Sequence, residues 1–322
     1  MAAPRARAEL LADGGAAAAG EQFFRSPQFL EAEGTTHTLK IEAGEPQLLA
    51  PLIVREIEGT ERRDAVSPYG YPGFVSEFDH TGAGSKSAAA SPLDPTSVDW
   101  SATGLVSVFI RHRLDAPPLA GTTERNVVQI ADPALPPKSR PSDRRQIRRN
   151  LEAGYRLELV PGPEASAPQR AAFLAAYEQT MRRTDAAPQY YFAASYFERI
   201  LSVPRTWLAL AVDPGGEVAA ASIAVLSDGY LHYYLSGSAD ARLRDSPMKN
   251  VVARLVELAT ALGLPLNLGG GISPGDALEE FKRGFANRQL GWHSSELICD
   301  PVAYRELSAG RDAGGHFPAY RA

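Results

Sequence analysis

The fold is decided by residues 230–268, which read YLHYYLSGSADARLRDSPMKNVVARLVELATALGLPLNL. Residues 230–236 are rich in aromatic side chains and are typical of a β-strand. Residues 247–262 have apolar side chains at helical spacing, and Gly263 is a residue type that commonly ends a helix. Residues 265–268 predict a short buried strand. A strand, a long helix and a second strand in this order indicate a domain of α/β type.

Further helices and strands are predicted on both sides of this stretch. In the second half of the chain we expect helices at 168–184, 193–201 and 276–285, the last with Asp276 as its N-cap, and strands at 206–212, 218–226 and 292–298. In the first half we expect a helix from Ser26-Pro27, a basic helix at 142–153 with Ser142 as its N-cap, and strands at 37–43, 48–58, 105–112, 126–131 and 155–160. Residues 79–91, rich in Gly, Ser and Ala, predict a mobile insertion. The overall prediction is an α/β (α+β) protein with mixed sheets flanked by helices.

The composition is that of a folded chain without a strong overall charge. The chain has 322 residues, of which 44% are hydrophobic and 22% are charged, and this length suggests two domains. The formal net charge is −5. A whole-molecule basic field for nucleic acid is therefore absent, although a local basic patch can still bind phosphates.

Cysteine content and hydropathy indicate the compartment. Cys299 is the only cysteine, so no intrachain disulfide can form, and we expect a cytoplasmic protein with a buried, inert thiol. No stretch of about 18 apolar residues occurs, so no membrane span is expected. Residues 1–21 lack the apolar core of a secretory signal and predict a flexible leader. No spacing of His, Cys and carboxylates resembles a metal site, and no Ser-His-Asp grouping is supported.

Several motifs resemble those of a known family when they are taken in order. Leu231 to Ser238 precedes the predicted long helix, and Leu268-Gly269-Gly270-Gly271 follows it. Asp276 and the element Phe281-Lys282-Arg283-Gly284-Phe285 come next. The order of elements resembles the GNAT-type N-acyltransferase fold, and these motifs resemble the Fem family of aminoacyl-tRNA-dependent aminoacyltransferases. The resemblance covers about residues 23–307 and is strongest at 177–285.

The resemblance implies two GNAT-type N-acyltransferase-like domains in tandem. On this basis we expect a leader at 1–21, a first domain on the acceptor side at 22–160, and a second domain on the donor side at 161–322. The implied reaction moves an amino acid from aminoacyl-tRNA to an amine. It needs no cofactor beyond aminoacyl-tRNA as the co-substrate.

Two departures from related sequences bear on the substrates. Coenzyme A-dependent acyltransferases have a glycine-containing loop before the long helix, and its N–H groups bind pyrophosphate. The equivalent residues 241–248, ARLRDSPM, contain no glycine, and Pro247 has no N–H to donate. This favours aminoacyl-tRNA as the donor. The long helical-hairpin arm of some peptidoglycan-bridge members is also missing, which favours a peptidyl or nucleoside natural product over a peptidoglycan precursor as the acceptor.

Lys282 and Tyr234 are the catalytic candidates. The resemblance implies that the Lys282 ammonium lies near the reacting carbonyl or the tRNA 3′ end, where a cation stabilises developing negative charge. The alternative is a solvated helix lysine beside Glu279 and Glu280. Tyr234 and Ser236 are expected on one side of their strand, where Tyr234 would orient the acceptor or the aminoacyl group.

Aromatic residues are candidates for the walls of a substrate site. Phe281 and Phe285 share a helical face, and they either pack in the core or wall the terminal adenosine. Tyr69 and Tyr71 lie in the loop Ser67 to Gly73, which resembles a loop of the family. They form either a substrate wall or local packing.

Basic residues are candidates for binding phosphates and carboxylates. Arg111 would bind a carboxylate or phosphate, and His112 would either relay a proton or serve the fold. The predicted basic helix would hold phosphates of the tRNA or of a nucleotide-linked acceptor, or it is simply a solvated basic helix. The arginines on its shared face are Arg144, Arg145, Arg148 and Arg149.

We therefore predict an aminoacyltransferase that forms a peptide bond on a peptidyl or nucleoside natural product or on a peptidoglycan precursor. Direct attack by the amine is expected, because no enzyme nucleophile is evident. The expected partners are aminoacyl-tRNA, an amine-bearing peptidyl or nucleotide-linked acceptor, and a carrier protein or biosynthetic partner. The alternatives are a coenzyme A-dependent N-acyltransferase and a non-catalytic binding module of the same fold.

Overall fold

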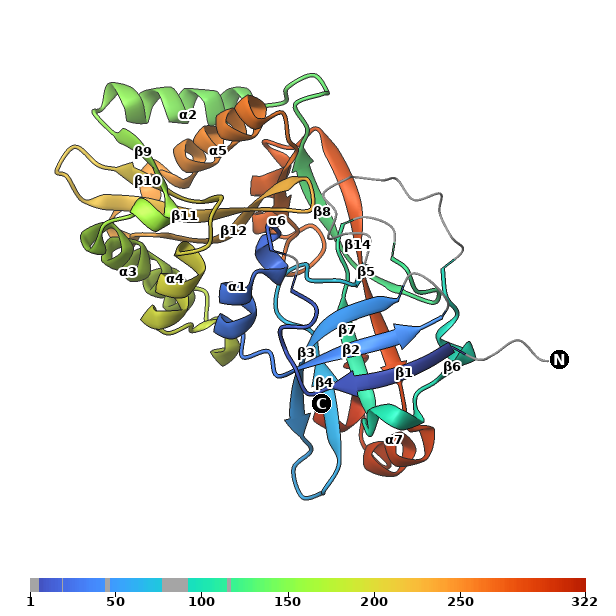
Figure 1. The fold of residues 1–322 in the computed structure, drawn as a ribbon. Helices are drawn as coiled ribbons and strands as arrows, with labels where there is room; N and C mark the ends of the chain where they lie inside the picture. The colour runs from blue at the N-terminus through green and yellow to red at the C-terminus, as the bar shows by residue number, and fades with distance from the viewer. Residues whose placement is uncertain (1–5, 19, 44–46, 77–91, 115–116) are drawn as a thin grey trace. The chain divides into compact units, whose positions relative to one another are not determined.

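The structure is a computed structural model that describes residues 6–18, 20–43, 47–76, 92–114 and 117–322. The chain forms two compact units, one joining Met1–Arg125 to Trp292–Ala322 and the other comprising Asn126–Gly291. Each unit contains a mixed sheet with helices packed on it (Figure 1), which confirms the predicted fold class. The division into tandem domains at 22–160 and 161–322 stays a prediction. The predicted insertion at 79–91 lies outside the described residues.

The first unit is built on a sheet whose strands come from both ends of the chain. In spatial order the strands are β6 (Val98–Asp99), β1 (Ala6–Leu11), β2 (His37–Glu42), β3 (Leu48–Glu56), β4 (Arg63–Val66), β7 (Ser107–Arg111) and β14 (Arg288–Ile298), and β5 (Val75–Ser76) pairs with β3. β1 pairs parallel with β6 and β4 pairs parallel with β7, while the other neighbours are antiparallel. The helices α1 (Pro27–Ala32) and α7 (Pro301–Ser308) belong to this unit.

Strand β1 corrects the expectation of a flexible leader for residues 6–11. Ala6 and Ala8 are 8% and 0% exposed in the core of this unit. The strand pairs with β2 from Arg7 opposite Glu42 to Leu11 opposite Thr38. Alanine has low strand propensity and a small side chain, so the pattern ARAELL gave little local signal. Pairing with β2 and burial against the core determine the conformation instead.

The buried carboxylate of Asp64 forms hydrogen bonds with Tyr320 and Arg321 near the end of the chain. Asp64 on β4 is 0% exposed. It accepts hydrogen bonds from Arg55 Nε at 3.0 Å, Arg321 Nε at 2.5 Å and the Tyr320 hydroxyl at 3.2 Å. Tyr320 also lies 2.7 Å from the Ser107 hydroxyl. The last residues thus satisfy a charge that would be costly to leave unpaired in the interior.

We expect Arg321→Ala to lower the free energy of unfolding by about 2–4 kcal/mol, because it removes partners from a buried carboxylate. Chemical denaturation measures this change. The matched control is Arg62→Ala, which removes an ion pair of 2.8 Å to Glu306 between side chains 42% and 58% exposed. That exposed pair is expected to be worth at most about 1 kcal/mol. Equal losses in the two variants would contradict the role given to Asp64.

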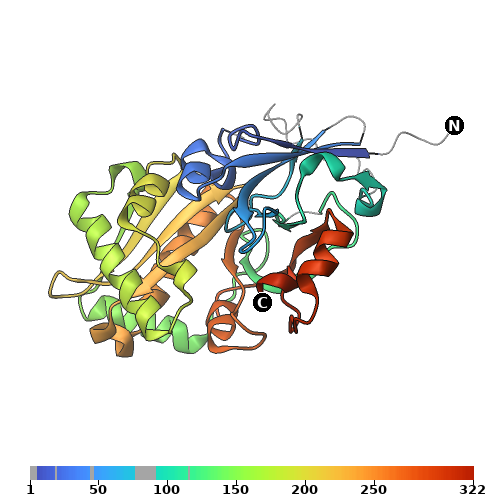
Figure 2. The same ribbon diagram turned by 90° about the horizontal axis from the view of Figure 1, so that it is seen from below.

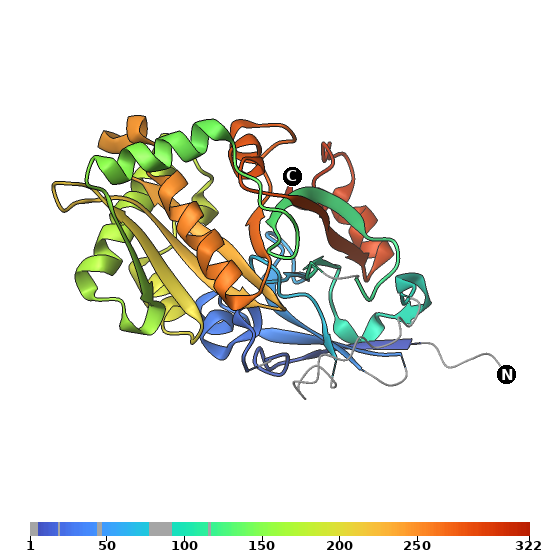
Figure 3. The same cartoon turned by 90° about the horizontal axis from the view of Figure 1, so that it is seen from above.

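The second unit places a sheet between two layers of helices. In spatial order its strands are β8 (Thr123–Ala131), β13 (Leu266–Gly269), β12 (Tyr230–Ser238), β11 (Val218–Ser227), β10 (Thr206–Val212) and β9 (Arg156–Pro161), and β12 and β13 are the parallel pair. The helices α3 (Ala167–Arg183) and α4 (Ala194–Leu201) cover one face (Figure 2). The helices α2 (Pro141–Glu152) and α5 (Met248–Leu262) cover the other face (Figure 3), and α6 (Ala277–Arg283) follows β13.

Small residues on the strands allow α5 to pack closely on this sheet. Ala209, Ala211, Ala220 and Ala224 share a buried cluster with Val251, Val252 and Leu255 of α5. The helices and strands expected in the second half of the chain are confirmed in type and order. The predicted N-cap of the basic helix is wrong. Pro141 takes the first helical position and Arg140 is the N-cap, because proline is favoured at that position.

Candidate active site

Lys282 lies on α6, just after the glycine turn formed by residues 269–271. Asp276 begins the helix as predicted, since its carboxylate accepts the N–H of Glu279 at 2.7 Å. The same carboxylate accepts the N–H of Ile272 at 2.7 Å, which fixes the end of the loop before the helix. The Lys282 ammonium donates to the carbonyl of Gly270 at 2.6 Å.

The environment of Lys282 is not that of a solvated surface lysine. The residue is 8% exposed, and the neighbouring carboxylates of Glu279 and Glu280 pair with Arg283. Burial lowers the pKa of Lys282 to about 8, although the charge of Asp276 acts in the opposite direction. An ammonium has three N–H donors. In the described part of the chain only the Gly270 carbonyl accepts from it, so two of its donors have no acceptor there.

Polar side chains enclose the three glycines of the turn. Gly269 has a φ of +75°, and a Cβ there would lie 3.2 Å from Lys282 Nζ. A Cβ on Gly270 would lie 2.4 Å from the amide of Asn126, which donates to the carbonyl of Gly271 at 2.8 Å. A Cβ on Gly271 would lie 2.5 Å from Asp276. The positive φ favours glycine at 269, and a side chain at 270 or 271 would displace the Asn126 amide or the Asp276 carboxylate.

Phe281 and Phe285 pack in the hydrophobic core of the second unit. Their ring centroids are 5.6 Å apart, and both contact the cluster that contains residues of α5. Phe285 is only 5% exposed. These contacts support core packing for both rings, and their role as a wall for adenosine stays a prediction.

Tyr234 faces the layer formed by α3 and α4. Its hydroxyl lies 2.8 Å from the hydroxyl of Tyr196 on α4, whose ring stacks on Phe192 at 4.2 Å. The pairing of β11 with β12 shifts after Ile223–Leu235 to Ala224–Tyr233, so Tyr234 is the extra residue of a β-bulge.

The bulge overturns the expectation that Tyr234 and Ser236 share a face. Ser236 accepts a hydrogen bond of 2.6 Å from Tyr233, which packs against the core cluster on the α5 side. At the next position a Cβ on Gly237 would meet the α3 backbone at Ala176, 2.4 Å away. The extra residue breaks the alternation of the strand, so Ser236 points away from the face that carries Tyr234.

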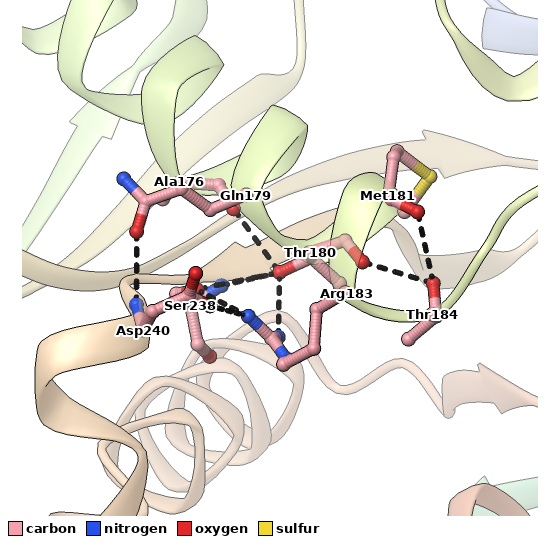
Figure 4. Close-up of polar contacts among 8 residues, drawn as sticks. All are labelled: Ala176, Gln179, Thr180, Met181, Arg183, Thr184, Ser238 and Asp240. Atoms are coloured by element: carbon pink, nitrogen blue, oxygen red, sulfur yellow. Dashed lines mark hydrogen bonds and ion pairs between the residues drawn. The ribbon is translucent and has the colours of Figure 1, made fainter.

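Side chains hold the segment that connects β12 to α5. Its 3-10 helix, Asp240–Asp245, begins beside the C-terminal end of α3 (Figure 4). Gln179 accepts the N–H of Asp240 at 2.9 Å, Thr180 accepts the N–H of Ser238 at 2.9 Å, and Arg183 forms an ion pair with Asp240. The connection is therefore anchored to α3 at its first residues.

The far end of the same segment is anchored to α2. Asn150, which is 2% exposed, donates to the carbonyl of Asp245 at 2.8 Å and to the Asn250 side chain at 2.7 Å. Tyr155 donates to the Asp245 carboxylate at 2.6 Å. In the first turn of α5 the N–H groups of Lys249 and Asn250 donate to the carbonyls of Ser246 and Pro247, both at 3.0 Å. These two backbone donors are thus already used within the chain.

The four predicted arginines form an exposed face of α2. Arg144, Arg145, Arg148 and Arg149 are exposed, while Asp143 is buried on the other side. The Arg144 side chain donates to the Ser139 carbonyl. Within the described ranges, the side chains of the other three arginines have no hydrogen-bond or ion-pair partner.

The start of α2 lies directly beside the helix of Lys282. Arg140 donates to the Glu280 carboxylate on α6 at 2.8 Å. A Cβ on Gly284, the residue that ends α6, would lie 2.8 Å from the carboxylate of Asp143. The structure therefore brings the arginine helix and the lysine helix together within one compact unit.

The remaining candidates lie in the first unit. The N–H of Tyr69 donates to Glu33 at 2.9 Å. The ring of Tyr71 packs edge-on against Phe24 at 5.4 Å and Trp292 at 6.0 Å. These contacts show local packing of the loop, and a substrate role for the two tyrosines stays a prediction.

Arg111, the last residue of strand β7, and His112, which follows it, have different surroundings. Arg111 donates to the Ser67 carbonyl at 3.0 Å and lies over the ring of Phe109. His112 is 1% exposed, and its Nε2 lies 2.7 Å from the Ser295 hydroxyl. Burial, with the charges of His293 and Arg113, lowers the pKa of His112 to about 4. A neutral, enclosed ring of this kind supports the structural alternative for His112.

Sequence reasoning missed the buried polar pair behind the glycine turn. His232 and Asn267 are opposite each other in the parallel pairing of β12 with β13. Asn267 Nδ2 lies 3.0 Å from His232 Nδ1, and Asn267 Oδ1 accepts the N–H of Gly269 at 2.8 Å. A signal was present, because Asn267 is a polar residue between Leu266 and Leu268 in a strand predicted to be buried.

In the described part of the chain, no group of three or more His, Cys, Asp or Glu side chains is placed to hold a metal ion. None of the helices in that part is both long enough and apolar enough to cross a membrane.

Comparison with known proteins identifies the fold. Residues 137–283 match the family model of an acetyltransferase (GNAT) domain. A solved structure titled FemX is 11% identical, with a TM-score of 0.59 over 91% of this chain and 96% of that chain. The L-PGS structure from Bacillus licheniformis is 13% identical, with a TM-score of 0.52 over 88% and 96%.

A third solved structure extends the comparison. The C-terminal domain of a putative lysylphosphatidylglycerol synthetase from Agrobacterium fabrum is 14% identical, with a TM-score of 0.53 over 88% of this chain and 89% of that chain. No curated protein sequence matches the chain. At these identities the structural likeness establishes the fold, so the predicted resemblance is confirmed at that level. The chain has a GNAT-type, Fem-like acyltransferase fold, and residues 137–283 are the part that matches the acetyltransferase (GNAT) family model.

Proposed function

We propose that this protein is an acyltransferase that moves an amino acid from aminoacyl-tRNA to an amine. The observation that carries the proposal is the Lys282 ammonium, which is 8% exposed and donates only to the Gly270 carbonyl within the described residues. A buried cation with unused donors stabilises an oxyanion more strongly than a solvated one does. The fold supports an acyltransferase, since it is shared with FemX and with the domain of the putative lysylphosphatidylglycerol synthetase described above.

The proposed chemistry requires little from the protein. The acceptor amine attacks the ester carbonyl of the aminoacyl-tRNA, and the carbonyl oxygen becomes negatively charged in a tetrahedral intermediate. Lys282 donates hydrogen bonds to that oxygen. The intermediate collapses to the new amide as the C–O bond to the ribose breaks, and the proton lost by the amine ends on the ribose hydroxyl. The ester is already activated, so the proposed reaction involves no cofactor and no covalent enzyme intermediate.

The segment between β12 and α5 favours tRNA over coenzyme A as the donor. It contains no glycine, and α3 and α2 anchor its two ends by side-chain contacts with Asp240 and Asp245. In the first turn of α5, the N–H groups of Lys249 and Asn250 donate to backbone carbonyls. Fewer donors are therefore available to cradle a pyrophosphate at this helix N-terminus.

The α2 arginines supply the proposed phosphate contacts. Three of them have no partner in the described part of the chain, and α2 begins beside the helix of Lys282. Arginine is well suited to phosphate because its planar guanidinium offers several donors. In this proposal the arginine face binds the acceptor arm of the tRNA, and Lys282 faces the ester at its 3′ end.

The proposed acceptor is an amine, and the kind of molecule that carries it is defined only broadly. We propose an amine on a peptidyl or nucleoside natural product, or on a peptidoglycan precursor, and a biosynthetic partner or carrier protein that presents it. Charged tRNA is a cytoplasmic molecule, so the proposed reaction takes place in the cytoplasm. A coenzyme A donor is the second candidate, because the family model that matches residues 137–283 is that of an acetyltransferase.

A transfer assay with radiolabelled, charged total tRNA tests the proposal. The acceptors offered are a simple dipeptide and a nucleotide-linked pentapeptide, and parallel reactions contain RNase or replace the tRNA with acetyl-CoA. We expect a labelled amide product that RNase treatment of the donor abolishes. Acetyl-CoA is expected to give no product and no rise in Tm. Product that survives RNase, or turnover with acetyl-CoA, would overturn the tRNA assignment. A Lys282→Met variant as active as the wild type would overturn the role given to Lys282, and no product in any reaction would support a binding module.

A further inference from the structure

We propose that Asn267 and His232 are positioning residues that hold the glycine turn in register with Lys282. The inference rests on the proposed function only in taking Lys282 as the reacting cation. Asn267 and His232 are 1% and 2% exposed, so water does not compete for their hydrogen bonds. They lie opposite each other on neighbouring parallel strands, and Asn267 is two residues before Gly269, where the glycine turn begins.

The contacts of His232 and Asn267 determine which of their atoms donate hydrogen bonds and which accept them. His232 Nε2 lies 3.2 Å from the backbone carbonyl of Ser227, which can only accept, so Nε2 carries the ring proton. His232 Nδ1 is then an acceptor, and Asn267 Nδ2 donates to it at 3.0 Å. This leaves Asn267 Oδ1 facing the turn, where it accepts the N–H of Gly269 at 2.8 Å. The ring thus determines which way the amide of Asn267 is oriented.

A hydrogen bond connects the glycine turn to the ammonium of Lys282. The residue after Gly269 supplies the carbonyl to which Lys282 donates at 2.6 Å. Asn126 holds the next carbonyl, that of Gly271, at 2.8 Å. The turn is therefore fixed at its entry by Asn267 and at its exit by Asn126, with the Lys282 contact between them.

Neutrality of His232 is needed for this arrangement. A proton on Nδ1 would oppose the donor of Asn267, and rotating the amide to avoid that contact would leave Gly269 without its acceptor. Burial lowers the pKa of His232 to about 4, so the ring is neutral across the physiological range. The charged group that acts on the pKa of Lys282 is Asp276, and its charge raises that pKa. Backbone N–H groups hold the Asp276 carboxylate at the start of α6.

Asn267→Leu removes both hydrogen bonds of the amide and keeps the branched shape of the side chain. The freed turn admits water to Lys282, and hydration removes the desolvation that lowers its pKa. The readout is the pH dependence of Lys282 acetylation by acetic anhydride, followed by mass spectrometry of the full-length protein. Exposed Lys138 in the same unit is the internal reference. This measurement needs no tRNA, so it separates failure of this inference from failure of the proposed function.

In the wild type we expect a midpoint for Lys282 near pH 8. In Asn267→Leu we expect it to rise by about one unit or more towards the ordinary lysine range. His232→Phe, which removes the ring contacts with the Asn267 amide and the Ser227 carbonyl but keeps the acceptor for Gly269, should give a smaller rise and serves if Asn267→Leu does not fold. Asn267→Asp should stay close to the wild type, because aspartate keeps the acceptor for Gly269 and can pair with a protonated His232. With a transfer assay, Asn267→Leu is also expected to lower kcat about tenfold to a hundredfold at an unchanged KM for the tRNA.

The matched control is Thr206→Val, which removes another buried hydrogen bond of this unit, from Thr206 Oγ1 to the Val203 carbonyl at 2.8 Å. It should lower the Tm and leave the Lys282 midpoint in place. The inference is overturned if the midpoint stays or falls in both Asn267→Leu and His232→Phe, or if Thr206→Val raises it equally.

Discussion

The Lys282→Met variant is expected to lose kcat for aminoacyl transfer by about a hundredfold to a thousandfold, the usual effect of removing one donor from an oxyanion site. Methionine has nearly the length of lysine and is unbranched, so it fills the same space without a charge. KM for the tRNA should change little, because the phosphates bind elsewhere in this proposal. Steady-state and single-turnover rates measure the loss. Lys40→Met, at a surface lysine paired with Glu9 and Glu42, is the matched control and should keep full activity.

The pH dependence of the single-turnover rate distinguishes two roles for Lys282, electrostatic stabilisation of the oxyanion and general-base catalysis. The pKa of Lys282 is lowered to about 8, so its charge is lost as the pH rises through that value. If the ammonium stabilises the oxyanion, the single-turnover rate has a descending limb near pH 8. Lys282→Arg keeps its charge throughout this range and should be slower but without that limb. A rate that instead climbs to a plateau near pH 8 in the wild type would show that Lys282 acts as a general base.

Stability should respond to pH in the opposite sense. The pKa of Lys282 is lower in the folded chain than in the unfolded one, so the unfolded state binds more protons between about pH 8 and pH 10. The folded state therefore gains stability as the pH rises through this window, by roughly 3 kcal/mol in total. Lys282→Met should lack this gain and be more stable than the wild type near pH 7. Loss of activity together with retained or increased stability excludes unfolding as the cause.

The sequence predicted the parts of this site that depend on neighbouring residues. Asp276 as the N-cap of α6 follows from its position before a helical pattern, and the structure confirms it. The long helix α5 and the short strand β13 were predicted because their apolar spacing and the intervening Gly263 act within a few residues. The location of Lys282 after a glycine run was likewise visible in the sequence. Its burial was not, because burial depends on what packs against α6.

What the sequence did not predict depends on distant pairing. His232 and Asn267 meet through the parallel register of β12 with β13, and no local pattern determines that register. The bulge at Tyr234 changes which face Ser236 occupies, and a single extra residue leaves no mark in an alternating pattern. Asn150 and Asn250 meet across 100 residues of chain. Strand β1 forms from alanines because β2 is available to pair with it, which local propensity cannot indicate.

Replacing Arg145, Arg148 and Arg149 together by glutamine is expected to raise KM for the aminoacyl-tRNA about tenfold to a hundredfold near physiological salt. These side chains are exposed on α2 and have no partner within the residues that the structure describes, so the fold should not depend on them. Each phosphate contact that is lost removes the counterion release that accompanied it. The kcat at saturating tRNA should remain near that of the wild type, because Lys282 and the glycine turn are unchanged.

The salt dependence of binding separates a specific phosphate grip from a general effect of charge. Each lost contact should make the slope of log affinity against log salt shallower by about 0.7–0.9, so the triple variant should lose about two units or more. The matched control replaces Arg7, Arg182 and Arg305, which are exposed in other elements, and removes the same charge. If binding requires the α2 face, this control keeps the wild-type slope. Equal losses in the two variants would mean that the −5 net charge, not a site on α2, governs tRNA binding. An unchanged slope in the α2 variant would remove that helix from the proposed tRNA interface.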